Sequence, residues 1–254
     1  PTPCFALDTH AGRGLYRLDD PSARRTGEAD AGVKALLRNG DGVPALDTYR
    51  EAIGACRALH GDSAYPGSPW LLAHALRAQD TIACCEVQPE EAKALQATFS
   101  GERRLRVQAG DGYAAMRALL PPRDGEARVG RGLVLIDPPY ETQLAEFDDA
   151  LAAIRDGLRR FPQGVFALWY PIKLRRSLGP FQRRAADLPA KSALLAELMV
   201  RPDDSPLRMN GSGLLVVNAP WQFDQALAPA LAAMARALGE RGASPRLHWL
   251  RSPP

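Results

Sequence analysis

The chain has 254 residues, 46% of them hydrophobic, which is enough for one large α/β domain with a sizeable core. Its formal net charge of +3 does not by itself indicate a nucleic-acid-binding protein. No apolar run reaches membrane-spanning length and no signal-peptide pattern occurs, so we expect a cytoplasmic protein without a membrane partner. The four cysteines have neither metal-ligand nor disulfide spacing, so we expect no metal site.

The first predicted strand, Cys4–Leu7, leads directly into an acidic, glycine-containing turn, Asp8–Gly14. A strand followed by an acidic residue and glycines is typical of the nucleotide-binding opening of a doubly wound sheet, because glycines let the backbone approach a ligand. The turn is not GxGxxG and no Walker lysine follows, so NAD and ATP are poorly supported. Taken alone, Gly12 and Gly14 would more often mark an ordinary loop, and His10 would more often be structural than a ligand contact.

Two predicted helices interrupt the alternation of strands and helices that follows. They span Glu28–Arg38 and Val43–Leu59, with an Asn-Gly-Asp-Gly turn between them. We interpret them as a small inserted helical subdomain over residues 27–64. The main domain is then formed by residues 1–26 and 65–254.

The next polar residues stand at the boundaries of predicted elements. Ser68 is placed to cap a helix over Trp70–Arg77, a role that is compatible with a ligand contact. The predicted strand Thr81–Cys85 ends at Glu86, and a carboxylate at the end of the second strand can bind both hydroxyls of a cofactor ribose. The interval from Asp8 is longer than usual for such a carboxylate, and the helical insert accounts for the excess.

A third predicted strand, Leu105–Ala109, is followed by Asp111, for which two interpretations stay open. Its carboxylate could accept a hydrogen bond from the adenine amine of a cofactor, or it could be the N-cap of a helix over Tyr113–Leu120. The segment Pro121–Arg131 is rich in proline, glycine and charge, and it is predicted to be a loop.

The most informative stretch is Gly132–Tyr140, which reads GLVLIDPPY. Its apolar residues Leu133–Ile136 suit a parallel strand buried on both faces, and the prolines after Asp137 cannot continue a central strand. The Asp137 carboxylate and the Tyr140 ring are thereby held at the carboxyl end of a strand, where open α/β sheets bind ligands. Asp137 and a nearby carbonyl would hold the hydrogens of an adenine amine, and Tyr140 would stack on the flipped base. A bare Asp-Pro-Pro can equally well just end a strand.

The remaining predicted elements continue the alternation. Apolar spacing indicates a helix through Phe147–Phe161, and the strand Val165–Tyr170 is predicted to end at Pro171. Of its two terminal aromatics, Trp169 and Tyr170, one is expected in the core and the other is available to stack on a base. Three further strands and a helix are predicted over Ser192–Val200, Gly213–Asn218, Arg246–Leu250 and Gln225–Leu238.

Several longer strings resemble one protein family. They are LDTHAGRG (Leu7–Gly14), RTGE (Arg25–Glu28), YPGSP (Tyr65–Pro69), GLVLIDPPYE (Gly132–Glu141), ALWYP (Ala167–Pro171) and SGLLVVNAPW (Ser212–Trp221). Together they resemble the bacterial 23S ribosomal RNA adenine-N6 methyltransferase family over essentially the whole chain. The resemblance implies an α/β, Rossmann-like class I methyltransferase fold: a doubly wound sheet with a small inserted helical subdomain.

The resemblance also implies a reaction and the residues that perform it. S-adenosylmethionine would be the methyl donor and 23S ribosomal RNA the partner, with no metal, and the protein is expected to be a monomer. The implied cofactor contacts are His10, Ser68, Glu86, Asp111 and Gly112. In the same way, Asp137 would hold and accept from the target amine, and Tyr140 would stack on the flipped adenine.

Other functions and one departure from the family stay open. Asp-Pro-Pro-Tyr also occurs in amino-methyltransferases that act on DNA adenine or on guanine N2, and a non-catalytic RNA-binding module could keep the same fold. The chain begins Pro1-Thr2-Pro3 without a methionine, so we expect it to be cut from a longer one. Family members begin with a His- and Lys-bearing segment whose histidine joins the cofactor site. Nothing in this sequence matches it, and the chain alone is expected to bind cofactor weakly or to be inactive.

Overall fold

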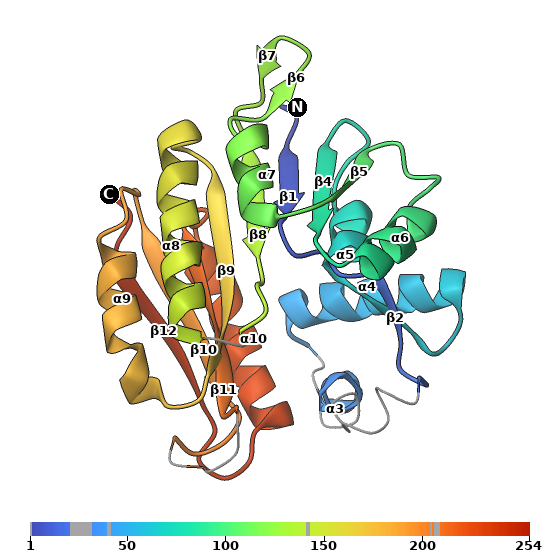
Figure 1. The fold of residues 1–254 in the computed structure, drawn as a ribbon. Helices are drawn as coiled ribbons and strands as arrows, with labels where there is room; N and C mark the ends of the chain where they lie inside the picture. Colours follow the sequence, from blue (N-terminus) through green and yellow to red (C-terminus); the bar gives the residue numbers. More distant parts are fainter. Residues whose placement is uncertain (1, 21–31, 40–41, 141–142, 204, 206–208) are drawn as a thin grey trace.

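A sheet of eight strands forms the centre of the molecule (Figure 1), with the strand order β12-β10-β11-β9-β8-β1-β4-β5. This computed structural model describes all residues except 1, 21–31, 40–41, 141–142, 204 and 206–208. Within the described ranges, no helix combines the length and the apolar character needed to cross a membrane.

Five parallel strands make up one part of this sheet. They are β1 (Phe5–Asp8), β4 (Thr81–Glu86), β5 (Leu105–Ala109), β8 (Gly132–Ile136) and β9 (Val165–Ile172). β1 lies between β4 and β8, with Asp8 in register with Cys84 and Leu135. Because these strands run in the same direction, the residues that follow each of them meet at one edge of the sheet.

The other part of the sheet is antiparallel. It consists of β10 (Ala193–Met199), β11 (Gly211–Val217) and β12 (Ser244–Arg251). β11 pairs antiparallel with both β9 and β10, and β10 pairs antiparallel with β12. The sheet is therefore mixed.

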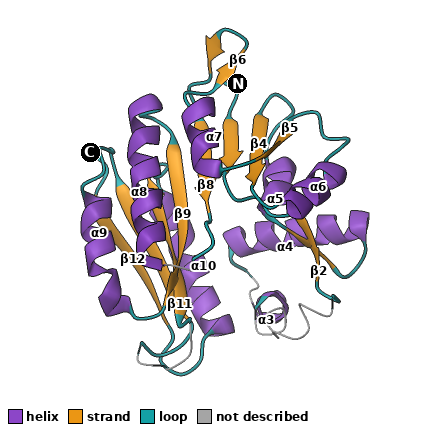
Figure 2. Ribbon diagram, in the orientation of Figure 1, coloured by secondary structure: helices purple, strands orange, loops and turns teal. Residues whose placement is uncertain are grey.

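Helices cover both faces of the sheet (Figure 2). Phe5 and Leu7 of β1 belong to one apolar cluster and Ala6 to another, because alternate residues of a strand point to opposite faces. The first face is covered by α7 (Gly112–Leu119), α8 (Gln143–Arg160) and α9 (Gly179–Ala186), the last preceded by a short 3-10 helix at Arg175–Leu178. The cluster on the opposite face includes residues of α4 (Pro44–His60), α5 (Ser68–Ala75) and α6 (Pro89–Thr98).

The predicted helical insert is represented by α3 (Val33–Asn39) and α4. Leu36 and Leu46 from these helices share a third apolar cluster with Ala230 and Ala233 of α10 (Phe223–Leu238). A small sheet of β2 (Leu15–Arg17) and β3 (Ala64–Pro66) flanks this region. The predicted helix start at Glu28 and the string Arg25–Glu28 lie outside the described residues. The division into residues 27–64 and the rest remains a prediction.

Two predictions near prolines and glycines are wrong. The segment Pro121–Arg131 is not simply a loop: β6 (Arg123–Asp124) pairs with β7 (Ala127–Arg128), and Gly125 at a φ of 59° makes the turn between them. β9 does not end at Pro171 but continues to Ile172. β8 ends at Ile136, opposite Leu168, so Pro171 lies beyond the β8 ladder and is in register with Ser212 of β11.

The prediction that Ser68 caps a helix is also wrong. α5 begins at Ser68 itself, its N-cap is Gly67, and no side chain makes a capping hydrogen bond there. A Cβ atom on Gly67 would lie 3.0 Å from the carbonyl oxygen of Gly14, so the glycine permits this close approach. The Ser68 side chain instead lies close enough to the Asp8 carboxyl group to lower its pKa.

Candidate functional site

Glu86 holds the glycine turn after β1 in place. Its Oε2 accepts a hydrogen bond from the Gly12 main-chain N–H at 2.9 Å, and its Oε1 accepts one from Gln88 N–H at 2.7 Å. Gly12 and Gly14 have φ values of 58° and 76°, in the left-handed region that favours glycine. Each carboxylate oxygen has two lone pairs, so Glu86 can hold the turn and still accept from a ligand hydroxyl.

His10 is held by a relay to β8. Its Nδ1 lies 2.8 Å from the Thr9 hydroxyl, which donates its own hydrogen to the Leu135 carbonyl oxygen at 3.0 Å. The hydrogen-bond pattern therefore assigns the proton of the neutral ring to Nδ1 and leaves Nε2 as an acceptor. Burial lowers the pKa of His10, which favours this neutral form. The Tyr113 ring contacts the imidazole edge-on, with ring centroids 5.3 Å apart.

Asp8 is a fully buried carboxyl group at the end of β1. Burial raises its pKa to about 6, hydrogen bonds from Ser68 and from the His10 main chain oppose the rise, and the Asp137 and Glu86 carboxylates add to it. Its Oδ2 has no hydrogen-bond partner among the described residues. The sequence pattern identified an acidic turn here, but it carried no signal that the acid is buried.

Asp111 and Gly112 form the start of α7. Asp111 Oδ1 accepts a hydrogen bond from Tyr113 N–H at 2.9 Å, so the N-cap interpretation is confirmed. A cofactor contact through its second oxygen stays a prediction. A Cβ atom on Gly112 would lie only 2.1 Å from the Thr9 carbonyl oxygen, so a glycine lets α7 begin against the turn after β1.

Asp137 and Tyr140 follow β8 without further regular structure. Asp137 is exposed at the surface, and desolvation by the residues around it raises the pKa of its carboxyl group to about 6. The Tyr140 hydroxyl donates a hydrogen bond of 2.5 Å to the Trp169 carbonyl oxygen, and the centroids of the two rings are 5.9 Å apart. Burial raises the pKa of Tyr140, so its hydroxyl stays a donor. Of the two aromatics near the end of β9, Tyr170 is fully buried, as expected for one of them, and Trp169 is partly exposed.

The predicted site residues gather at the carboxyl edge of the parallel strands. Six of the seven follow or end strands β1, β4, β5 and β8, namely His10, Glu86, Asp111, Gly112, Asp137 and Tyr140. Ser68 lies near them, because its side chain lowers the pKa of the Asp8 carboxyl group. The Glu86 and Asp111 carboxylates both raise the pKa of His10, against the effect of burial. Sequence reasoning missed the contributions of Thr9 and of the Trp169 carbonyl.

The chemistry of this set fits S-adenosylmethionine. That molecule carries a sulfonium and an ammonium cation, a ribose diol and an adenine amine, all of which need anions or acceptors. The edge provides carboxylates and a neutral imidazole with a free acceptor nitrogen. Together, the mixed α/β sheet and this acidic edge define a Rossmann-like class I methyltransferase that depends on S-adenosylmethionine, as predicted.

A family model described as "Ribosomal RNA large subunit methyltransferase D, RlmJ" matches residues 1–251. The chain belongs to this family of ribosomal RNA large subunit methyltransferases, and the predicted family is confirmed.

Individual relatives agree with this assignment. The chain is 36% identical over 226 residues to "Ribosomal RNA large subunit methyltransferase J" of Escherichia coli. This match covers 88% of this chain and 78% of that protein. The chain is 33% identical over 241 residues to the Haemophilus influenzae protein of the same name, covering 94% and 83%. A crystal structure of a Legionella pneumophila protein superimposes with a TM-score of 0.83 at 28% identity, over 97% of this chain and 88% of that one.

Proposed function

We propose that this protein transfers a methyl group from S-adenosylmethionine to the exocyclic N6 amine of an adenine in 23S ribosomal RNA. Its relatives are named for the large ribosomal subunit, and its strand-end motif is of the type that acts on amino groups. The observation that carries the proposal is the pairing of a carboxylate with an anchored ring. Asp137 is partly desolvated, and Tyr140, three residues away, is fixed to the next strand through Trp169.

Asp137 is the residue that makes the target amine reactive. The lone pair of an adenine amine is delocalised into its ring, so the amine is a poor nucleophile. An ionised Asp137 accepts a hydrogen bond from this amine, which frees the lone pair and orients it for in-line attack. With a pKa of about 6, the carboxyl group is mostly ionised at neutral pH. The bound cofactor supplies the activated methyl carbon.

Tyr140 holds the target base out of its helix. A base that reacts must leave its stack, and a flipped base is held by stacking on an aromatic ring. The hydroxyl bond to Trp169 restrains the tyrosine ring before substrate arrives, so less entropy is lost when the base stacks. Trp169 is partly exposed beside this ring and provides a second apolar surface for the base.

The remaining site residues would hold the cofactor. Glu86 accepts from the ribose hydroxyls, the free oxygen of Asp111 accepts from the cofactor adenine, and His10 Nε2 accepts a further hydrogen bond. Ser68 and Gly112 shape the same edge of the sheet. We further propose that the protein acts as a cytoplasmic monomer without a metal ion, which light scattering and assays in the presence of EDTA would test.

The decisive experiment is methyl transfer by the full-length protein from labelled S-adenosylmethionine to unmethylated 23S RNA or to duplex DNA. We expect label on RNA only, recovered as N6-methyladenine, and its loss in Asp137→Ala. Asp124→Ala, which changes an exposed aspartate of the β6–β7 hairpin, is the matched control and should remain active. Label on DNA, on guanine, or undiminished in Asp137→Ala would contradict the proposal.

A further inference from the structure

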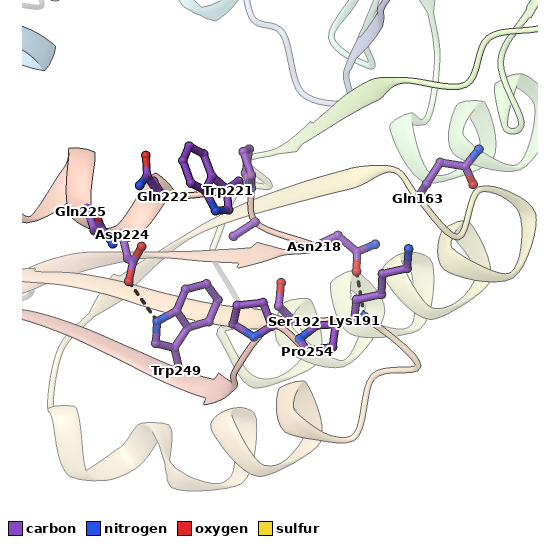
Figure 3. Close-up of a pocket in the computed structure, with 13 residues that line it drawn as sticks. Gln163, Lys191, Ser192, Asn218, Trp221, Gln222, Asp224, Gln225, Trp249 and Pro254 are labelled. Carbon is purple, nitrogen blue, oxygen red and sulfur yellow. Dashed lines mark hydrogen bonds between the residues drawn. The ribbon is translucent and has the colours of Figure 1, made fainter.

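A second candidate site lies at the opposite edge of the sheet from Asp137. A pocket of about 460 Å³ opens where β11 ends and β10 begins (Figure 3). Val217 at the end of β11 is in register with Phe166 near the start of β9, so the pocket adjoins the amino ends of the parallel strands. β9 has eight residues, which separates the two edges by about 25 Å at ~3.3 Å per residue.

Asn218 builds the turn that forms one wall of the pocket. Its Oδ1 accepts a hydrogen bond from the Lys191 main-chain N–H at 2.9 Å (Figure 3). Its Nδ2 donates to the carbonyl oxygens of Pro162 and Gly164, both at 2.9 Å. Its φ of 56° is uncommon for a residue that is not glycine, and these three bonds hold it there. The turn between β11 and α10 is therefore fixed in position at its start.

This turn presents Trp221 to solvent. The side chain is 87% exposed, although it is one of the largest apolar groups in the chain. The residue after it, Gln222, also has a left-handed φ, of 57°. Trp249 of β12 lines the same pocket, and its Nε1 donates to Asp224 Oδ2 at 3.3 Å (Figure 3). A rigid turn that leaves an indole in water is unfavourable for the free protein, and it is explained if a partner covers the ring.

The charges beside Trp221 favour a phosphate-bearing partner. Lys191 lines the pocket. The Arg251 guanidinium donates to the carbonyl oxygens of Ala190 and Ala186, and the first of these bonds places it next to Lys191 in the chain. In the part of the chain that the structure describes, neither cation forms an ion pair. The carboxylate that lines the pocket, Asp224, already accepts from Trp249. Unneutralised cations beside an exposed aromatic ring are the combination that binds single-stranded nucleic acid.

We propose that this pocket binds an unpaired nucleotide of the substrate RNA. Its base stacks on Trp221, and its phosphate meets Lys191 and Arg251. Gln163, Gln222 and Gln225 also line the pocket and supply amide groups that can hydrogen-bond to a base. This inference rests on the proposed function for the choice of RNA as the partner, and it adds a contact at the opposite edge of the sheet from the reacting amine. The enzyme thus recognises a long RNA at both edges of its sheet.

The test compares Trp221→Ala with wild type on two substrates. One is full-length unmethylated 23S RNA. The other is a short hairpin around the methylated adenine, located first by mapping the label in the long RNA. We expect Trp221→Ala to raise KM for the long RNA about tenfold, the order of one stacked base, without changing kcat. The short hairpin cannot reach the pocket, so its kinetics should not change. Trp221→Phe keeps a stacking ring and should lose little.

Two further measurements make the result decisive. Leu59→Ala removes another exposed apolar side chain, at the end of α4, and should leave both substrates unaffected. Filter binding of the long RNA, with ultraviolet crosslinking to locate the contact, does not depend on methyl transfer. Weaker RNA binding by Trp221→Ala would support the pocket even if wild type methylated no RNA, in which case the proposed function alone would fail. Unchanged RNA binding by Trp221→Ala would overturn the proposal and leave a protein partner as the occupant.

Discussion

The Tyr140 hydroxyl donates to the Trp169 carbonyl oxygen at 2.5 Å, and this bond joins the ends of two neighbouring parallel strands. Residues 137–140, which follow β8, have no regular structure, so this bond and ring packing together restrain Tyr140. Phe147 of α8 supports the other side of the contact, with its ring centroid 5.5 Å from that of Tyr140. The position of the stacking ring therefore depends on the end of β9.

Tyr140→Phe separates the ring from its anchor. The variant keeps a surface for stacking and loses one neutral hydrogen bond, worth about 1 kcal/mol. We expect methyl transfer to 23S RNA to slow about fivefold, with unchanged affinity for S-adenosylmethionine. Tyr140→Ala removes the ring as well and should slow transfer by a further tenfold or so. Equal losses in the two variants would mean that the hydroxyl, and not the ring, carries the function.

The acid limb of the pH profile should report Asp137. Its carboxyl group must be ionised to accept from the amine, and its pKa is raised to about 6 by burial. We therefore expect kcat/KM to fall as the pH drops below about 6. Asp8 also has a pKa near 6, so the control is Asp8→Asn, in which the acid limb should persist. Loss of the acid limb in Asp8→Asn would show that the limb reports Asp8 and not Asp137.

The buried Asp8 carboxyl group should lower the free energy of unfolding at pH values where it is ionised. Its pKa is raised from 3.8 to about 6 in the folded protein, so folding is favoured by this group at low pH and the benefit is lost as the pH rises through 6. Asparagine cannot ionise, and Asp8→Asn should unfold less readily than wild type at pH 8, by up to about 3 kcal/mol. Denaturant unfolding at pH 8 and pH 4.5 measures this. The difference should shrink at the lower pH, and a constant difference would point to packing instead.

The parallel strands and their terminal polar residues could be predicted from the sequence for a physical reason. β4 is an apolar run that is buried on both faces, and the polar residue that ends it, Glu86, marks the ligand edge. The same burial is expected for β8, which precedes Asp137, but only Val134 and Ile136 are buried there, while Leu133 and Leu135 keep partial exposure. The path of β9 through Pro171 could not be predicted, because it depends on where β8 ends. The role of the Trp169 carbonyl oxygen as acceptor for Tyr140 could not be predicted either, since every residue has a main-chain carbonyl. The same holds for the burial of Asp8, which depends on neighbours from other strands.

Gly112 is a position where the close approach of two segments can be tested. A Cβ atom there would lie 2.1 Å from the Thr9 carbonyl oxygen, and main-chain atoms cannot move aside as a flexible side chain can. We expect Gly112→Ala to cost about 1–3 kcal/mol of stability and to weaken cofactor binding, because α7 must shift away from the turn that carries His10. Gly101→Ala, where a Cβ would meet nothing within 4 Å, is the matched control. Unchanged cofactor affinity in Gly112→Ala would mean that the contact between Gly112 and Thr9 does not affect the cofactor site.

Glu197 of β10 is a fully buried carboxylate that hydrogen-bonds to Tyr170, the neighbour of Trp169 in β9. Its Oε1 accepts from the Tyr170 hydroxyl at 3.0 Å and from Gln182 Nε2 at 3.1 Å, and Arg175 Nε lies 3.4 Å from its Oε2. A Cβ atom on Gly213 would clash with the Tyr170 ring, so the glycine lets tyrosine reach across to Glu197.

Glu197→Ala leaves the Tyr170 hydroxyl and the Gln182 amide without their acceptor and the Arg175 guanidinium without its counter-ion. We expect it to lower the free energy of unfolding by about 3–5 kcal/mol, the usual penalty for breaking a buried ion pair. Glu197→Gln keeps an acceptor for Tyr170 and should lose less. The Glu197 network can also position the Trp169 carbonyl. In that case Glu197→Gln alone will reduce methyl transfer, but the same change added to Tyr140→Phe will not, because the bond to that carbonyl is already absent. Equal reductions in both backgrounds would limit Glu197 to stability.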